Sequence, residues 1–143
     1  MTSIADTLSR AAHLIDLLGL HTGDQFADSK SDALDVCAAI YFAAEGGFPP
    51  EFSTDEDASI RLIECSAPAM QAIRAISNAL DSEPCVTEIV PGHEVPDHIE
   101  HVSNWAATAP IGHTAPPTAS EVIGRILRTA NGLGVLRHTS IAA

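Results

Sequence analysis

Apolar residues recur at spacings of three and four in a series of short blocks, and glycine or proline closes each block. In the first block Ile4, Leu8 and Ile15 would share one face of a helix, and Gly19 follows directly behind it. This spacing is typical of amphipathic helices, and glycine and proline are residues at which helices end. The pattern therefore predicts an all-α fold, a compact bundle of five or six short helices, with room for one or two very short strands.

Capping residues and helix breakers predict where these helices begin and end. Ser53 with Glu56, and Thr118 with Glu121, each have the spacing of a capping box. We expect helices from Ser3 to Leu18, from near Ser31 to Ala44, from the Ser53 cap to Pro68, from Met70 to Leu80, from Pro96 to Pro110, and from Thr118 to an Asn131–Gly132 stop. Residues 85–90 are rich in β-branched side chains and form the clearest strand, and a shorter one fits Gln25 and Phe26.

The length of the chain favours a single domain. Its 143 residues match the usual size of one domain. We assign residues 1–134 to one helical domain and residues 135–143 to a C-terminal tail. With only four Phe, one Tyr and one Trp in the chain, alanine and aliphatic side chains have to fill the core.

Charge is strongly acidic overall and unevenly distributed. The formal net charge is −12, and the last 43 residues hold a single acid, Glu121, against Arg125, Arg128 and Arg137. An acidic chain is a poor general binder of nucleic acid, because phosphate binding needs a basic face. We therefore expect no direct nucleic-acid binding, and we expect the acidic and the basic parts to contact different partners.

The cysteines and the N-terminus point to a cytoplasmic location. Cys37, Cys65 and Cys85 are an odd number at wide spacings, without the pairing of a zinc or redox motif. Reduced thiols fit the cytosol. The N-terminal residues lack the basic start and apolar core of a signal peptide, and no apolar run is long enough to cross a membrane.

Two stretches, residues 11–44 and 103–131, resemble a family of small actinobacterial proteins of unknown function. The matching motifs are Gly19-Leu20, Cys37-Ala38-Ala39-Ile40, Asn104-Trp105 and Gly112-His113-Thr114. Leu20 stands where the family usually has an aromatic residue, and the order of Trp and Asn is reversed. The resemblance implies a helical fold and a bacterial source, and it implies no activity.

Metal-capable side chains are densest between His93 and His101. If a helix begins near Pro96, His98 and His101 lie three residues apart on one face, close enough to chelate one ion. Glu94 could add a ligand from the preceding loop, so His98, His101 and Glu94 form a candidate site for a divalent metal. A solvated loop followed by a first helical turn explains the same residues, and the spacing is not that of an H-E-x-x-H motif.

Trp105 is the only tryptophan of the chain, and a helix would place it on the same face as His101. It could be a core anchor whose indole N–H finds one partner, or part of a pocket wall beside Asn104. His113 belongs to the Gly112–Thr114 motif of the family resemblance. We take Asn104, Trp105 and His113 as candidate binding residues.

Three functions remain open at this point. The first is a protein-binding or regulatory module, with a homodimer compatible with its alanine-rich helix faces. The second is a small metal-binding protein or enzyme built on the His98, His101 and Glu94 cluster, although no nucleophile motif supports catalysis. The third is an acidic mimic of nucleic acid, which would occupy a basic groove on a partner. Its charge would come from Asp24, Asp28, Asp32, Asp35, Asp55, Glu56 and Asp57.

Overall fold

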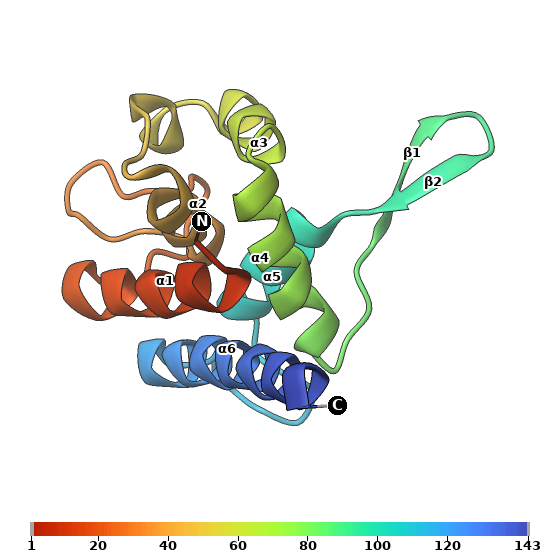
Figure 1. The fold of residues 1–143 in the computed structure, drawn as a ribbon. Helices are drawn as coiled ribbons and strands as arrows, with labels where there is room; N and C mark the ends of the chain where they lie inside the picture. Colours follow the sequence, from red (N-terminus) through yellow and green to blue (C-terminus); the bar gives the residue numbers. More distant parts are fainter. Residues whose placement is uncertain (1, 143) are drawn as a thin grey trace.

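The computed structural model describes the backbone of residues 2–142 and the side chains of residues 2–133 (Figure 1). In this part of the chain the fold is mostly helical, with six α-helices and a two-stranded hairpin, which confirms the predicted class. The elements are α1 (Ile4–Leu18), α2 (Val36–Glu45), the short 3-10 helix η1 (Pro50–Ser53), α3 (Glu56–Glu64), α4 (Ala67–Ala79), β1 (Val86–Val90), β2 (His93–Pro96), α5 (His98–Ala107) and α6 (Ala119–Ala142).

Helix α4 contacts all five other α-helices, and α1 packs against α2, α4 and α6 (Figure 1). The Ser3 side chain caps α1 by accepting a hydrogen bond from the Asp6 N–H, and Gly19 ends it with a positive φ of 100°. Small side chains let the helices approach closely: Ala11 and Ala12 of α1 are buried, as is the whole of residues 36–40 in α2. The prediction that alanine and aliphatic residues fill the core is confirmed.

Most of the few aromatic residues gather at one corner, around Phe52. Its ring is fully buried and lies 5.2 Å from the ring of Tyr41 and 5.9 Å from that of Phe26, centroid to centroid. The Phe52 carbonyl also accepts hydrogen bonds from the backbone N–H groups of Phe26 and Ala27. This corner holds the long connection between α1 and α2 against η1.

The predicted start of the second helix near Ser31 is wrong, since α2 begins at Val36. Residues 33–35 bond to other parts of the connection instead: the Leu34 N–H donates to the Gly19 carbonyl, and the Asp35 N–H donates to the Phe26 carbonyl. Asp35 then caps α2 by accepting from the Cys37 N–H at 2.7 Å. The strand expected at Gln25 and Phe26 is reduced to an isolated bridge between Ala27 and Leu34.

The capping box predicted at Ser53 is also wrong. Ser53 ends η1, and Asp55 caps α3 by accepting from the Ala58 N–H at 3.0 Å. Pro68 separates the third and fourth helices as expected, but it does so from the first turn of α4, where a proline has no intrahelical N–H to lose.

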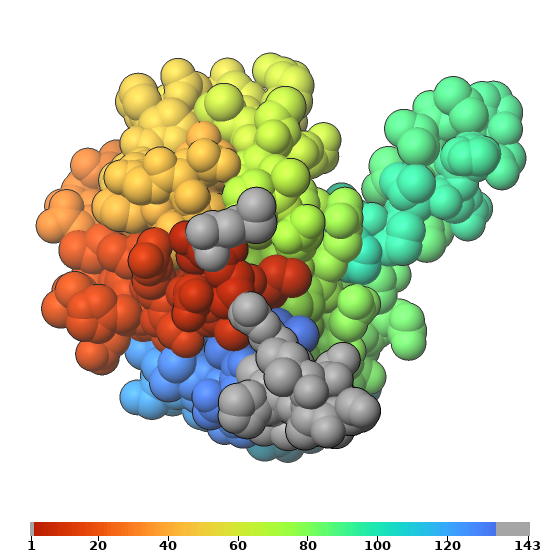
Figure 2. All heavy atoms as spheres, in the orientation of Figure 1, coloured from red at the N-terminus to blue at the C-terminus, as the bar shows by residue number. Residues whose placement is uncertain are grey.

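The strand predicted at residues 85–90 is confirmed as β1, but its partner β2 was not foreseen. Pro96 ends β2 and does not begin a helix, and Asp97 caps α5 by accepting from the Glu100 N–H. The hairpin projects from the helical body, away from α1 and α6 (Figure 2).

The capping box between Thr118 and Glu121 is confirmed, with each side chain bonding to the other residue's backbone N–H. Helix α6 continues past Asn131 and Gly132, so the predicted stop there is wrong. Side chains from residue 134 onward lie outside the described part, and the tail assigned to 135–143 stays a prediction. A bilayer-spanning helix needs about 20 apolar residues, and among the described residues no helix combines that length with that apolarity.

Candidate functional site

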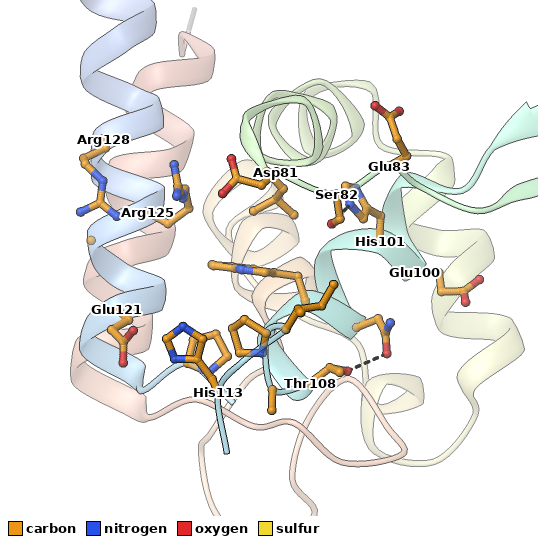
Figure 3. Close-up of a pocket in the computed structure, with 18 of the residues that line it drawn as sticks. Asp81, Ser82, Glu83, Glu100, His101, Thr108, His113, Glu121, Arg125 and Arg128 are labelled. Carbon is orange, nitrogen blue, oxygen red and sulfur yellow. Dashed lines mark hydrogen bonds between the residues drawn. The ribbon is translucent and has the colours of Figure 1, made fainter. Parts of the chain in front are cut away.

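A cleft of about 990 Å³ opens between α5 and α6 (Figure 3). Its walls come from the segment that follows α4, from one face of α5, from the loop between α5 and α6, and from α6 itself. We call it the α5–α6 cleft. Because four stretches of chain meet there, side chains that are far apart in the sequence come to face one another.

All three predicted binding residues line the α5–α6 cleft. Trp105 is half-buried: it packs against the core while part of its surface faces the cleft. The Asn104 side chain accepts a hydrogen bond from the Thr108 hydroxyl at 3.1 Å (Figure 3). His113 lies in the loop, where its N–H donates to the Pro110 carbonyl and closes a turn.

Charged side chains of both signs line the cleft, and Glu121 of α6 and Glu100 of α5 are among the acidic ones. Arg125 and Arg128 project from α6, and across from them stand Asp81 and Glu83 of the segment after α4 (Figure 3). The Arg128 guanidinium lies against α6 itself: a Cβ atom placed on Gly124 would meet Arg128 Nη1 at 3.1 Å. The missing side chain at Gly124 thus leaves room for Arg128.

A chain of serine and histidine side chains connects the cleft to the interior. Ser82 Oγ lies 2.8 Å from His101 Nε2, and Ser77 Oγ lies 2.6 Å from His101 Nδ1. Ser77 Oγ is also 2.8 Å from His98 Nδ1. Burial, followed by the nearby charges of Arg74 and His101, lowers the pKa of His98, which favours its neutral form. Ser82 and His101 reach the cleft, whereas Ser77 is buried.

The candidate metal ligands do not lie together: two belong to the row of serine and histidine side chains described above, and the third lies on the hairpin. His98 and His101 share one face of α5 as predicted, but the Nδ1 atoms of both lie beside Ser77. Glu94 is on β2, where it pairs with Glu88 across the hairpin. Within the described residues, no three His, Cys, Asp or Glu side chains are grouped so that they could hold a metal ion.

A second buried polar cluster joins α2 to α5. The Ser103 hydroxyl lies 3.2 Å from Asp35 Oδ1, and the Cys37 thiol lies 3.6 Å from the Ile99 carbonyl. Burial raises the pKa of Asp35 to about 6, against the opposing effect of hydrogen bonds from Ser103 and the Cys37 N–H. Burial and the neighbouring Asp35 carboxylate raise the pKa of the Cys37 thiol, which agrees with its predicted role as a small apolar residue.

The buried position of Asp35 also corrects the acidic-mimic hypothesis. Asp35 was counted among its surface charges, yet this side chain is 6% exposed and caps α2. Asp28 is turned toward its own loop, where it accepts from the Lys30 N–H and the Ser31 hydroxyl. The backbone bond to Lys30, then the bond to Ser31, lowers the pKa of Asp28.

Sequence reasoning did not select Ser77 or Ser82, and it noted Arg125 and Arg128 only as members of the least acidic part of the chain. The two arginines carried a usable signal, since they are three residues apart on a predicted helix in the least acidic part of the chain. The two serines carried no such signal in the sequence, because their role depends on contacts with His101, which lies on α5, a helix to which neither serine belongs.

The described fold and site define a small helical domain with an open cleft of mixed polarity. The chain belongs to the Family of unknown function (DUF6197), whose model matches residues 1–132. That result confirms the resemblance to a family of unknown function, and it adds no activity. No match was found among curated proteins or among solved structures.

Proposed function

We propose that this protein is a small cytoplasmic binding module that holds a segment of a partner protein in the α5–α6 cleft. The observation that carries the proposal is the position of Trp105, which is half-buried and lines the cleft together with Asn104 and the arginines of α6. The three cysteines Cys37, Cys65 and Cys85 are free thiols, which supports the location.

The size and lining of the cleft support a ligand with several side chains. Its volume of about 990 Å³ lies at the upper end of the usual range for ligand pockets. Tryptophan and arginine are the residues most enriched where binding energy is concentrated in protein interfaces. The rim is apolar, because Ile111 is fully exposed and lies beside Pro110.

The charges indicate what kind of segment the cleft accepts. The guanidinium groups of Arg125 and Arg128 present donors whose geometry matches carboxylates. Trp105 and Ile111 offer apolar surface. A segment that places an acidic side chain at the arginines and aliphatic ones at Trp105 and Ile111 would satisfy both. Its acidic group has to stay clear of the cleft's own carboxylates, which are those of Asp81, Glu83, Glu100 and Glu121.

Selection from a displayed random-peptide library tests this proposal. We expect recovered peptides to combine acidic and aliphatic residues, and Trp105→Ala to weaken their binding at least about ten-fold, as for a typical interface anchor. Arg10→Ala is the control, because Arg10 is exposed on α1 outside the cleft. Peptides that bind the Trp105→Ala variant as tightly as the original chain would refute the proposal.

A second candidate function is hydrolysis, and the contact between Ser82 and His101 favours it. A serine hydroxyl beside a histidine, itself oriented by a third group such as Ser77, is the arrangement of an activated nucleophile. With a fluorophosphonate probe, Ser82 Oγ would bond to phosphorus, fluoride would leave, and the serine proton would pass to His101.

Labelling of the intact protein decides this second candidate. We expect the original chain and Ser120→Ala to be labelled and Ser82→Ala to remain unlabelled, because Ser120 lines the same cleft without a histidine contact among those described. An unlabelled original chain, or labelling that survives Ser82→Ala, would reject hydrolysis at this site.

A further inference from the structure

The β1–β2 hairpin carries apolar side chains that the fold of a single chain leaves uncovered. Every residue of both strands is exposed, including Val86, Ile89 and Val90, each more than half exposed. A two-stranded hairpin without a packed face is at best marginally stable in water. The hairpin stands clear of the helical body in Figures 1 and 2, so its aliphatic side chains remain available to another molecule.

The register of the hairpin places two like charges opposite each other. Glu88 pairs directly with Glu94, whereas Thr87 pairs with Val95. Like charges in directly opposed positions destabilise a sheet. The segment 83–97 contains four acidic residues and no lysine or arginine, so it holds no cation that could compensate. A cationic surface on another molecule would relieve this repulsion.

The part of the α5–α6 cleft around Arg125 and Arg128 offers a complementary surface, because these side chains supply positive charge and Trp105 and Ile111 supply apolar area. Four acidic side chains line the same cleft, so the complementarity is local to the two arginines: Asp81, Glu83, Glu100 and Glu121. No residue of β1 or β2 is among those that line the cleft of its own chain. The hairpin therefore has the chemistry that the cleft accepts but does not occupy it within one copy.

We propose that the hairpin of one copy of this chain occupies the α5–α6 cleft of a second copy, with Glu88 and Glu94 against Arg125 and Arg128. The inference rests on the proposed function, since it names an occupant for the same cleft. Glu83 and Cys85 line the cleft and lead directly into β1, so the arm and its receptor lie next to each other on the chain. Two copies can then exchange hairpins reciprocally, which closes a two-fold dimer.

Sedimentation of the purified chain at increasing concentration provides the test. We expect a mass of twice 15.0 kDa at about 100 µM, where even weak protein interfaces are populated. The variant Glu88→Arg with Glu94→Arg, and separately the variant Arg125→Glu with Arg128→Glu, should dissociate at least about ten-fold more readily. Glu64→Arg, an exposed position on α3, should leave the dimer intact.

Mixing the two charge-reversed variants is the decisive experiment. Each mixed dimer would pair an arginine hairpin with a glutamate cleft and a glutamate hairpin with an arginine cleft, so association should return. An original chain that stays monomeric, a dimer that survives both reversals, or a mixture that does not associate would overturn the inference. These surface positions lie outside the buried core, so loss of folding does not confuse the result.

The outcome is separable from that for the proposed function. Peptides selected for the cleft should bind the Glu88→Arg with Glu94→Arg variant undiminished, because its cleft is unchanged. If the original chain is monomeric while peptides still bind, hairpin exchange fails and the binding function stands. If peptide binding is indifferent to Trp105→Ala, the binding function itself fails.

Discussion

The absence of a side chain at Gly124 lets Arg128 lie close against α6. A Cβ at Gly124 would lie 3.1 Å from Arg128 Nη1, one helical turn away on α6, so the guanidinium would have to shift by a few tenths of an ångström. Glycine is otherwise unfavourable inside a helix, where it destabilises by about 1 kcal/mol relative to alanine. At this position the helix gives up some stability, and the Arg128 guanidinium gains room beside it.

Replacing Gly124 with alanine should separate stability from binding. We expect Gly124→Ala to raise the free energy of unfolding by up to about 1 kcal/mol, and to weaken binding of the selected peptides slightly because the Arg128 guanidinium has to shift by a few tenths of an ångström. Gly132→Ala is the matched control, since Gly132 is also helical and a Cβ there would meet nothing within 4 Å. Denaturant unfolding and peptide titration measure both effects; equal affinities for the two variants would contradict the role given to Gly124.

Asp35 connects two elements, because it caps α2 and also accepts from Ser103 of α5. Its buried carboxyl has a pKa of about 6, above the usual 3.8. Between about pH 4 and about pH 6 the Asp35 carboxyl keeps its proton in the folded chain but has released it in the unfolded chain. The contribution of Asp35 to stability therefore falls as the pH rises through this range.

Asp35→Asn should remove this pH dependence while keeping a capping oxygen at α2. The shift of roughly two pKa units corresponds to a loss on the order of 3 kcal/mol between pH 4 and pH 7 in the original chain. Denaturant unfolding of both chains across that range isolates the effect, with Asp57→Asn, exposed on α3, as the control for removing one carboxylate. If the free energy of unfolding varied with pH in the same way for the original chain and for Asp35→Asn, Asp35 would not be the source of the pH dependence.

Local signals in the sequence predicted some elements and misplaced others. The cap of α6 was predicted because the Thr118 and Glu121 side chains bond to each other and to each other's backbone, within three residues of chain. The start of α2 was misplaced because its preceding residues bond to Gly19 and Phe26, which no helical periodicity reveals. Pro96 suits a first helical turn and a strand end equally, and the pairing of β1 with β2 decided between them.

The candidate site was predictable only in part for the same reason. Trp105 and Asn104 could be selected because the chain has a single tryptophan. The sequence could not show that Ser82 and Arg125 belong to the same site, since the cleft forms only when the segment after α4 packs beside α5 and α6.

At the scale of the whole molecule, a helical body carries one projecting acidic arm and one cleft in which Arg125 and Arg128 lie (Figures 1 and 3). The uneven distribution of charge along the sequence corresponds to these two features of the structure. The arm belongs to the acidic first hundred residues, and the arginines belong to the least acidic part. The arm is acidic, whereas the cleft carries charges of both signs.

Fluorescence of Trp105 reports directly on the cleft, because no other tryptophan contributes to the signal. Titration with a peptide selected for the cleft should change this emission saturably. The variant Arg125→Glu with Arg128→Glu should require at least about ten-fold more peptide, as expected when paired charges are reversed. A titration curve that is the same for the original chain and for this variant would contradict the assignment of the α5–α6 cleft as the binding site.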